Sequence, residues 1–168
     1  MGQYRCGDPM KEDTTLGPLI NEEAAAKVER LVADAQAKGA ATLVGGRRDG
    51  LYYEATVLDG VTTVMDVAVE EIFGPVMPVL TVENDRTALE ISNASEYGLD
   101  SCVFTRNIDR ARWLAGELQD GSVTVNGVPR HGMGVFPFGG NKKSGIGREG
   151  LKYSIDEFTR LHTVVFQS

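Results

Sequence analysis

Two neighbouring carboxylates and an aromatic ring occupy one short segment in the middle of the chain. The segment reads Glu70-Glu71-Ile72-Phe73-Gly74-Pro75, and a run of β-branched residues follows it. A carboxylate can accept hydrogen bonds from two adjacent hydroxyl groups and an aromatic ring offers an apolar face, so the segment could hold a polyhydroxylated ligand. The plainer interpretation is an acidic entrance to a strand with Phe73 in the core, and composition alone favours it.

Neither cysteine has the neighbours of a catalytic thiol. Cys6 lies directly before Gly7-Asp8-Pro9, which indicates an exposed turn, and no histidine is near it in sequence. Cys102 stands between Ser101 and Val103 in a predicted strand, so we expect it to be a small buried core residue. We expect neither cysteine to act as a nucleophile.

A glycine-rich stretch in the last third of the chain offers a second place for chemistry. Arg130 and His131 lie within it, and a guanidinium there could bind a carboxylate or phosphate of a substrate. Two solvated loop residues are an equally good interpretation. Residues 139–148 superficially look like a phosphate-binding loop, but the pattern Gly-x-x-x-x-Gly-Lys-Ser/Thr is absent, which argues against one.

The elements that must position these groups alternate between helix and strand. Strands separated by helices indicate right-handed crossovers and a parallel sheet, whose ligands gather at the loops that leave the carboxyl ends of the strands. The predicted elements are a helix over 22–38 capped by Asn21, a strand or extended run over 52–58, a strand over 76–82, a helix capped by Asn84, a strand over 101–105, a helix over 108–118, a strand over 122–125, a helix over 149–158 and a strand over 161–166.

Composition excludes several classes of partner. The 168 residues carry 17 basic and 24 acidic side chains, a net charge of -7, which has the wrong sign for a nucleic-acid surface or a polybasic membrane anchor. Two cysteines and two histidines are too few for a disulfide framework or a structural zinc site. No apolar run approaches the roughly 18 residues of a membrane span. We expect a cytoplasmic protein without a metal.

Five separated motifs together resemble one family, the NAD(P)-dependent aldehyde dehydrogenases, and specifically the C-terminal part of their catalytic domain. The resemblance covers nearly the whole chain, from about residue 7 to residue 166. The motifs, in the family's order, are Gly7-Asp8-Pro9 with Leu16-Gly17-Pro18-Leu19-Ile20, then Glu70-Glu71-Ile72-Phe73-Gly74-Pro75, then Tyr97-Gly98-Leu99, then Val123-Thr124-Val125-Asn126, and then Pro137-Phe138-Gly139-Gly140 with Lys142, Ser144-Gly145, Gly147 and Arg148-Glu149.

The resemblance implies an α/β fold with a parallel-sheet βαβ core, a C-terminal strand for oligomerisation and no Rossmann cofactor domain. It implies a single partial catalytic domain over residues 1–168. Its parts would be an extended segment (7–21), an α/β core (22–125), a glycine-rich substrate loop (126–148) and a terminal helix and strand (149–168).

The resemblance also implies roles for individual residues. Glu71 would hold the ribose nearest the nicotinamide of NAD or NADP, and Phe73 would pack beside the nicotinamide ring. Asn126 and Phe138 would shape the entrance for a small-molecule aldehyde. Arg130 and His131 then become candidates for selecting an acidic or hydroxylated aldehyde.

One departure from the family pattern decides what the chain can do. The family's nucleophile follows a Gly-Gln-x-Cys pattern, whereas here Gly2-Gln3-Tyr4-Arg5-Cys6 has a different spacing and abuts the turn. By the same resemblance, the glutamate base that activates water is also missing, and we therefore assign no catalytic residue. We expect a C-terminal fragment of an enzyme that oxidises an aldehyde to a carboxylic acid through a cysteine thiohemiacetal, inactive by itself and homo-oligomeric. The alternative is a non-catalytic α/β module for binding or assembly.

Overall fold

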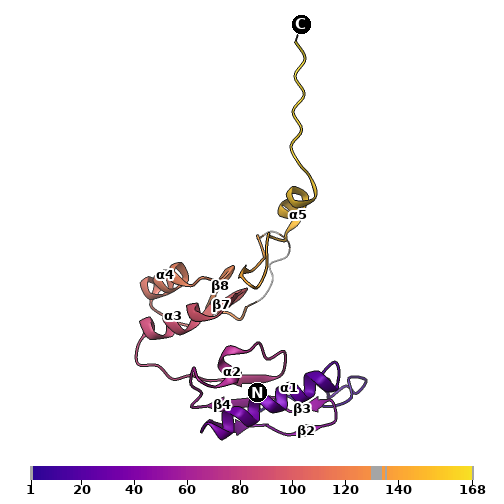
Figure 1. Ribbon diagram of the computed structural model, residues 1–168, viewed down its shortest axis with the longest axis vertical. Helices are drawn as coiled ribbons and strands as arrows, with labels where there is room; N and C mark the ends of the chain where they lie inside the picture. The colour runs from indigo at the N-terminus through magenta and orange to yellow at the C-terminus, as the bar shows by residue number, and fades with distance from the viewer. Residues whose placement is uncertain (1, 130–133, 135, 168) are drawn as a thin grey trace. The chain divides into compact units, whose positions relative to one another are not determined.

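The computed structural model of the chain describes residues 2–129, 134 and 136–167. The chain divides into two compact units, Met1–Val82 and Glu83–Ser168, which are described separately (Figure 1). Both units combine helices with short strands, so the α/β class is confirmed.

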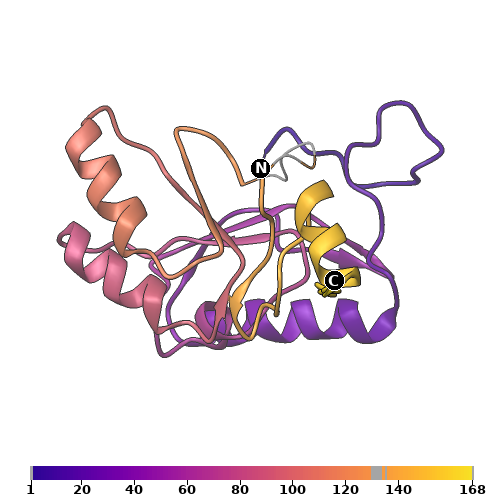
Figure 2. The same cartoon turned by 90° about the horizontal axis from the view of Figure 1, so that it is seen from above.

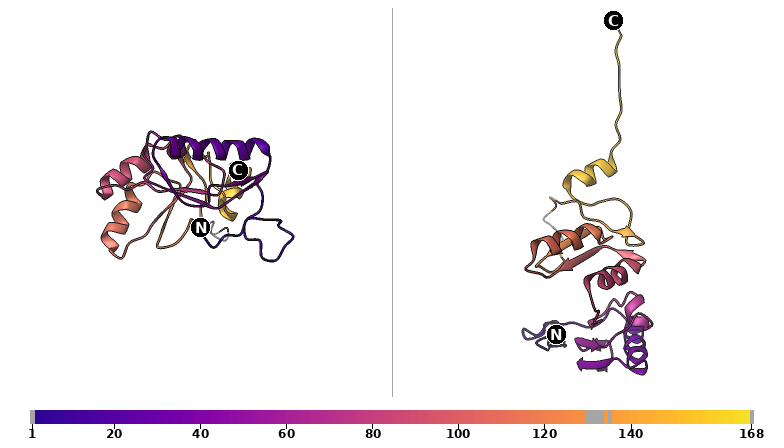
Figure 3. Two further views of the ribbon diagram at one scale, coloured as in Figure 1. Left: turned by 90° about the horizontal axis from the view of Figure 1, so that it is seen from below. Right: turned by 90° about the vertical axis from the view of Figure 1, so that its left-hand side faces the viewer.

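The first unit is built on a long amphipathic helix, α1 (Glu22–Ala37). The Asn21 side chain accepts a hydrogen bond from the backbone N–H of Ala24 and caps the helix, as predicted. One face of α1 is buried, and its apolar residues follow the spacing of a single helical stripe: Ala25, Val28, Leu31, Val32 and Ala35. In the right-hand view of Figure 3, α1 stands beside the strands of this unit.

A three-stranded mixed sheet supports α1. The strands are β1 (Ala41–Val44), β4 (Thr56–Asp59) and β5 (Val76–Pro78), in the order β1-β4-β5. The β1–β4 pair is antiparallel and the β4–β5 pair is parallel, with Thr56 opposite Val76. The core cluster joins apolar side chains of α1 to the fully buried Leu58 and to Tyr53.

Three short elements complete the first unit. The strands β2 (Arg48–Asp49) and β3 (Tyr52–Tyr53) form a small antiparallel hairpin. The helix α2 (Asp66–Val69) follows β4 and leads directly into the segment that contains Glu71.

The second unit contains one parallel strand pair joined through a helix. The strand β7 (Asp100–Val103) pairs with β8 (Ser122–Val125), and α4 (Ile108–Glu117) connects them. The helix α3 (Asp85–Ala94), capped by Asn84 as predicted, lies beside α4 (Figure 2). The strands β6 (Tyr97–Gly98) and β9 (Asn141–Lys142) pair antiparallel, and α5 (Leu151–Phe158) follows.

The prediction of a single parallel sheet is wrong in two respects. Only Val76–Pro78 of the predicted strand 76–82 is a strand. This strand pairs with β4, whereas β7 and β8 form a separate sheet. The prediction missed β4 as the partner because the helix that connects β4 to β5, α2, has only four residues and leaves no helical period in the sequence.

The C-terminal segment does not form the predicted strand within this chain. Residues 159–167 have no regular secondary structure, and Leu161 and Phe166 are almost fully exposed. A strand exists only through hydrogen bonds to a neighbour, and this segment pairs with no strand in the described part of the chain.

Cys102 also departs from the prediction, because it is exposed rather than buried. Side chains alternate along β7, and Cys102 falls on its outward face.

Close contact between two glycines should determine the stability of the second unit. A Cβ atom on Gly121 would collide with the carbonyl oxygen of Gly139. We expect Gly121→Ala to lower the free energy of unfolding by about 2 kcal/mol, as for an overpacked site. Gly116→Ala is the matched control, since nothing lies near that position on α4, and it should raise stability by about 0.5 to 1 kcal/mol. Urea unfolding of both variants tests this, and equal effects would contradict it.

Candidate functional site

The segment from Glu70 to Pro75 forms a turn between α2 and β5. The N–H of Glu70 donates to the carbonyl oxygen of Asp66 at 2.8 Å and ends the helix. The turn closes where the N–H of Val76 donates to the carbonyl oxygen of Gly74 at 2.8 Å. The N–H of Thr56 then donates to the carbonyl oxygen of Pro75 at 2.8 Å, which fixes the start of β5. We call residues 70–75 the acidic turn.

Glu71 presents its carboxylate to solvent while its backbone is held in place. The residue is exposed, and no hydrogen bond or ion pair engages its carboxylate among the residues that the structure describes. Its carbonyl oxygen accepts a hydrogen bond from Lys27 Nζ at 2.6 Å. The backbone is therefore anchored to α1 and the carboxylate remains able to accept hydrogen bonds from a ligand.

Phe73 adopts a backbone conformation that directs its ring away from the core. Its φ is 47°, in the left-handed region that residues with a side chain rarely adopt, and 77% of the residue is exposed. The neighbouring Gly74 packs so closely on Val28 of α1 that a Cβ atom there would collide with the valine side chain. The interpretation that placed Phe73 in the core is therefore wrong, because close approach of the backbone to α1 leaves no room for the ring beneath the turn.

Glu70 is engaged by an arginine of α1. Arg30 donates to the Glu70 carboxylate at 2.7 Å and to the Asp66 carboxylate at 3.0 Å. On the same side, Lys38 pairs with Asp34 at 2.8 Å, and the hydrogen bond from Lys38 lowers the pKa of Asp34 below its ordinary value. The two glutamates of the turn thus differ: Glu70 is paired and Glu71 is open to solvent.

In the second unit, Asn126 stabilises the end of the parallel strand pair. Its φ is 56°, which asparagine tolerates better than most residues. Its Oδ1 accepts from the N–H of Thr105 at 2.9 Å, and its Nδ2 donates to the carbonyl oxygen of Thr105 at 2.9 Å. The side-chain amide is therefore occupied by the segment that leaves β7, and it fixes the start of the loop after β8.

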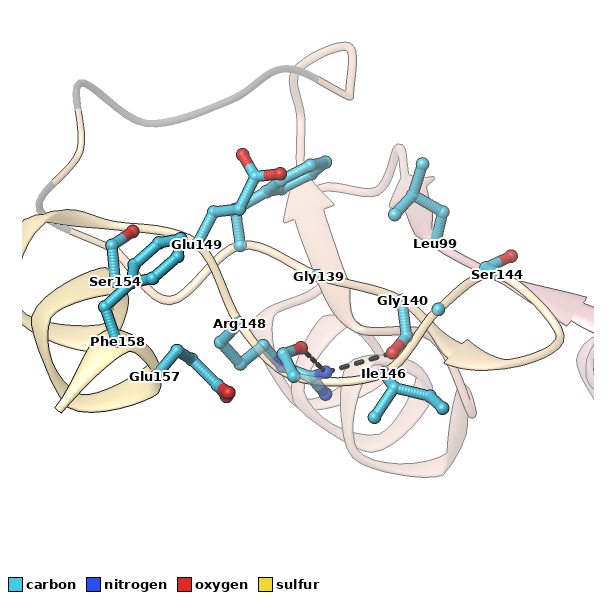
Figure 4. A pocket seen from close by; sticks show the side chains of 13 residues that line it. Leu99, Gly139, Gly140, Ser144, Ile146, Arg148, Glu149, Ser154, Glu157 and Phe158 are labelled. Carbon is cyan, nitrogen blue, oxygen red and sulfur yellow. Dashed lines mark hydrogen bonds between the residues drawn. The ribbon is translucent and has the colours of Figure 1, made fainter. Parts of the chain in front are cut away.

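Phe138 lies where the glycine-rich segment returns to the second unit. Its N–H donates to the carbonyl oxygen of Glu149 at 2.9 Å, and the two residues form an isolated antiparallel bridge. A cavity of about 580 Å³ opens beside it (Figure 4). The lining residues drawn there include Leu99, Glu149 and Phe158. This places Phe138 at the edge of a hollow that is lined by both apolar and acidic groups.

Arg148 organises the wall of this cavity, and the sequence interpretation gave it no role. Its guanidinium donates to the carbonyl oxygens of Gly140 at 2.9 Å and Gly147 at 2.8 Å, and to Asn141 Oδ1 at 2.7 Å. Figure 4 shows the two bonds to backbone carbonyls. A single arginine within a run of glycines is the signal that could have indicated this role, because glycine carbonyls are not covered by side chains.

The remaining predicted substrate residues, Arg130 and His131, lie outside the described residues.

Cys6 is half-buried, and its thiol donates to the carbonyl oxygen of Tyr53 at 3.5 Å. Burial raises the pKa of the Cys6 thiol above its ordinary value, which lowers the fraction of reactive thiolate at neutral pH.

Residues 2–129, 134 and 136–167 contain no group of three or more histidine, cysteine, aspartate or glutamate side chains arranged to hold a metal ion. Over the same residues, none of the helices combines the length and the apolar character needed to cross a membrane.

Comparison with known proteins gives consistent matches. The model of the aldehyde dehydrogenase family matches residues 1–164. A lactaldehyde dehydrogenase of Methanococcus maripaludis is 38% identical over 96% of this chain and 35% of its own length. An NADP-dependent glyceraldehyde-3-phosphate dehydrogenase of Streptococcus equinus is 45% identical over 94% of this chain and 33% of its own length. The chain therefore spans about a third of the length of these relatives.

Solved structures agree in fold. The NADP-dependent glyceraldehyde-3-phosphate dehydrogenase of Bacillus halodurans, solved as a complex with NADP, superposes with a TM-score of 0.91 at 41% identity, covering 94% of this chain and 33% of that one. An aldehyde dehydrogenase of Physcomitrella patens, in complex with succinate, gives a TM-score of 0.87 at 39% identity, covering 92% of this chain and 32% of that one.

The conformation of Phe73 leads to a stability prediction. A side chain in the left-handed region costs about 1 to 2 kcal/mol, and glycine removes that cost. We expect Phe73→Gly to raise the free energy of unfolding by about 1 kcal/mol in urea. Phe104→Gly is the control, because Phe104 is similarly exposed without a positive φ, and it should be destabilising by about 0.5 to 1 kcal/mol. If both variants lose stability equally, the strain at Phe73 is not present in solution.

Proposed function

Because the chain belongs to the aldehyde dehydrogenase family, we propose that it forms part of the cofactor and substrate sites of an enzyme that oxidises an aldehyde to a carboxylic acid with NAD or NADP. One observation carries the proposal. The acidic turn exposes the Glu71 carboxylate and the Phe73 ring together, although the backbone strain at Phe73 works against that exposure.

The two exposed groups fit the nicotinamide half of such a cofactor. The Glu71 carboxylate can accept hydrogen bonds from both hydroxyl groups of a ribose, and the Phe73 ring can contact a planar heterocycle. A bound nicotinamide cofactor would accept hydride from the substrate. The Bacillus halodurans structure, which is similar over 94% of this chain, was solved with NADP, which supports this choice of ligand.

The substrate side is proposed to lie in the loop after β8. Asn126 would act by shape, because its amide is bonded to Thr105 and fixes the direction in which the loop leaves the strand. Phe138 would line the aldehyde entrance, and Arg130 and His131 would select the aldehyde by charge or hydrogen bonding.

The 168 residues by themselves are proposed to be inactive. The reaction needs a thiolate that attacks the aldehyde carbonyl to form a thiohemiacetal. Cys6 is held as a thiol with a raised pKa, and its sequence context does not match the nucleophile pattern. A cofactor contacted on one side only should also bind weakly, because few contacts offset the entropy lost on association.

A second candidate function is a non-catalytic module for assembly. The exposed apolar side chains of the C-terminal segment favour it, since Leu161, Val164, Val165 and Phe166 are all largely exposed. A homo-oligomer in which this segment pairs with a second copy would bury them. Both functions can hold for one chain.

An NMR titration tests the cofactor proposal. We expect NAD or NADP, added to the ¹⁵N-labelled 168-residue chain, to shift the amide resonances of residues 71–74 with a dissociation constant on the order of millimolar. Glu71→Gln should abolish most of this shift because the neutral amide accepts ribose hydrogen bonds less strongly. Glu23→Gln, an exposed glutamate on α1, is the control and should bind like the parent chain.

Three outcomes would count against the proposal. Shifts that avoid residues 71–74 would remove the site. Micromolar affinity, or reduction of the cofactor on addition of an aldehyde, would contradict the one-sided site and the inactivity of the chain. Self-association without any cofactor-dependent shift would favour the assembly module instead.

A further inference from the structure

We propose that Arg30 is a positioning residue that sets the direction of the Glu71 carboxylate by fixing the residue before it. The inference rests on the proposed function, because it assigns Arg30 to the cofactor site without a contact to the cofactor. Arg30 lies on α1, 41 positions before Glu71 in sequence, and reaches the acidic turn through Glu70.

The guanidinium joins two consecutive elements. Nη2 of Arg30 donates to Glu70 Oε2 at 2.7 Å, and Nη1 donates to Asp66 Oδ2 at 3.0 Å. Asp66 begins α2 and Glu70 ends it, so the arginine holds both ends of this four-residue helix. A helix of one turn has little stability of its own, so an external clamp is needed to define where it ends. The end of α2 is the start of the acidic turn.

Neighbouring residues of α1 complete the same support. Lys27 Nζ donates to the carbonyl oxygen of Glu71 at 2.6 Å, and Val28 packs against Gly74. Arg30 therefore contacts Glu70, the first residue of the turn, Lys27 contacts Glu71, the second, and Val28 contacts Gly74, the last before Pro75. We call these three residues the α1 platform. The turn is held on the platform side, and the exposed side carries Glu71 and Phe73.

Asp66 is itself held independently of Arg30. Its N–H donates to Asp34 Oδ2 at 2.9 Å, and its carboxylate also accepts from Lys38 at 3.3 Å. Removing the arginine side chain should therefore leave α2 attached at its start and free it at its end. We therefore expect an Arg30 substitution to loosen Glu70 and the residues that follow it, while the start of α2 stays in place.

The ion pairs of Arg30 should contribute little to global stability. The side chains of Arg30 and Glu70 are 51% and 40% exposed, and exposed pairs are weakened by solvent and salt. The hydrogen bond that Arg30 donates to Glu70 raises the pKa of Arg30 above its ordinary value, so the guanidinium is charged at neutral pH. If Arg30 is a positioning residue, its substitution should leave the free energy of unfolding unchanged and alter the cofactor site. A purely structural residue would change the free energy of unfolding as well.

The test compares Arg30→Met with Arg48→Met in the 168-residue chain. Arg48 also pairs with glutamates of α1, Glu22 and Glu29, but it does not contact the acidic turn. For Arg30→Met we expect lower ¹H–¹⁵N heteronuclear NOE values at residues 71–74 than in the parent chain, unchanged values in β5, and a dissociation constant for NAD raised by about threefold or more. The urea midpoint of Arg30→Met should stay close to that of the parent chain, because its ion pairs are exposed.

Two further variants keep the result interpretable. Glu70→Ala removes the partner instead of the arginine and should reproduce the loss of order at residues 71–74. Arg30→Lys, which can replace one of the two hydrogen bonds, should restore part of it. Unchanged NOE values in both Arg30→Met and Glu70→Ala would overturn the proposal, as would a loss of stability that spreads over the whole unit.

The outcome for Arg30 is separable from the outcome for the cofactor site. The NOE measurement needs no ligand, so it reports on the α1 platform even if NAD does not bind. If the parent chain shows no shift at residues 71–74 with NAD while Arg30→Met still loosens the turn, the proposed function fails and the clamp on Glu70 stands without its role in cofactor binding. If the parent chain binds NAD and Arg30→Met binds equally well, the positioning role fails alone.

Discussion

The close approach of the acidic turn to α1 is the constraint on which the rest of the proposed site depends. Gly74 can touch Val28 only because it has no side chain, and this contact leaves Phe73 with a positive φ and an outward ring. Lys27 and Arg30 hold the backbone and the preceding residue from the same helix. The strain at Phe73 is therefore maintained by several contacts at once, which is the usual condition for strained backbone at a binding site.

The second unit uses its motif residues in a similar way, mainly to shape the backbone. Ser144 Oγ accepts from the N–H of Gly98 at 2.9 Å, and Lys142 Nζ donates to the carbonyl oxygens of Asn93 and Ser95 at the end of α3. Arg148 donates hydrogen bonds to two carbonyl oxygens of the glycine-rich segment. Many of the residues that carry the family resemblance thus build supports, and fewer of them point into an open site.

Local patterns predicted the helices well and the pairing of strands poorly. The caps Asn21 and Asn84 and the buried face of α1 follow from side chains within a few residues of one another. The partner of β5, by contrast, is a strand about twenty residues earlier, and residues 161–166 pair with no strand in the part of the chain that the structure describes. Composition also placed Phe73 in the core, because nothing in a phenylalanine indicates a positive φ. The roles proposed for Glu71 and Phe73 come from the resemblance to the family, whereas those proposed for Arg30 and Arg148 come from contacts that only the three-dimensional structure shows.

The most direct measurement of the central claim is a transferred NOE between protons of the Phe73 ring and protons of the nicotinamide ring, recorded on the 168-residue chain with excess NAD. Weak binding and rapid exchange suit this experiment. The account predicts cross-peaks from Phe73 to the nicotinamide and its adjoining ribose, and their loss in Glu71→Gln. Cross-peaks to the adenine alone, or none from Phe73 while the cofactor binds elsewhere, would contradict it.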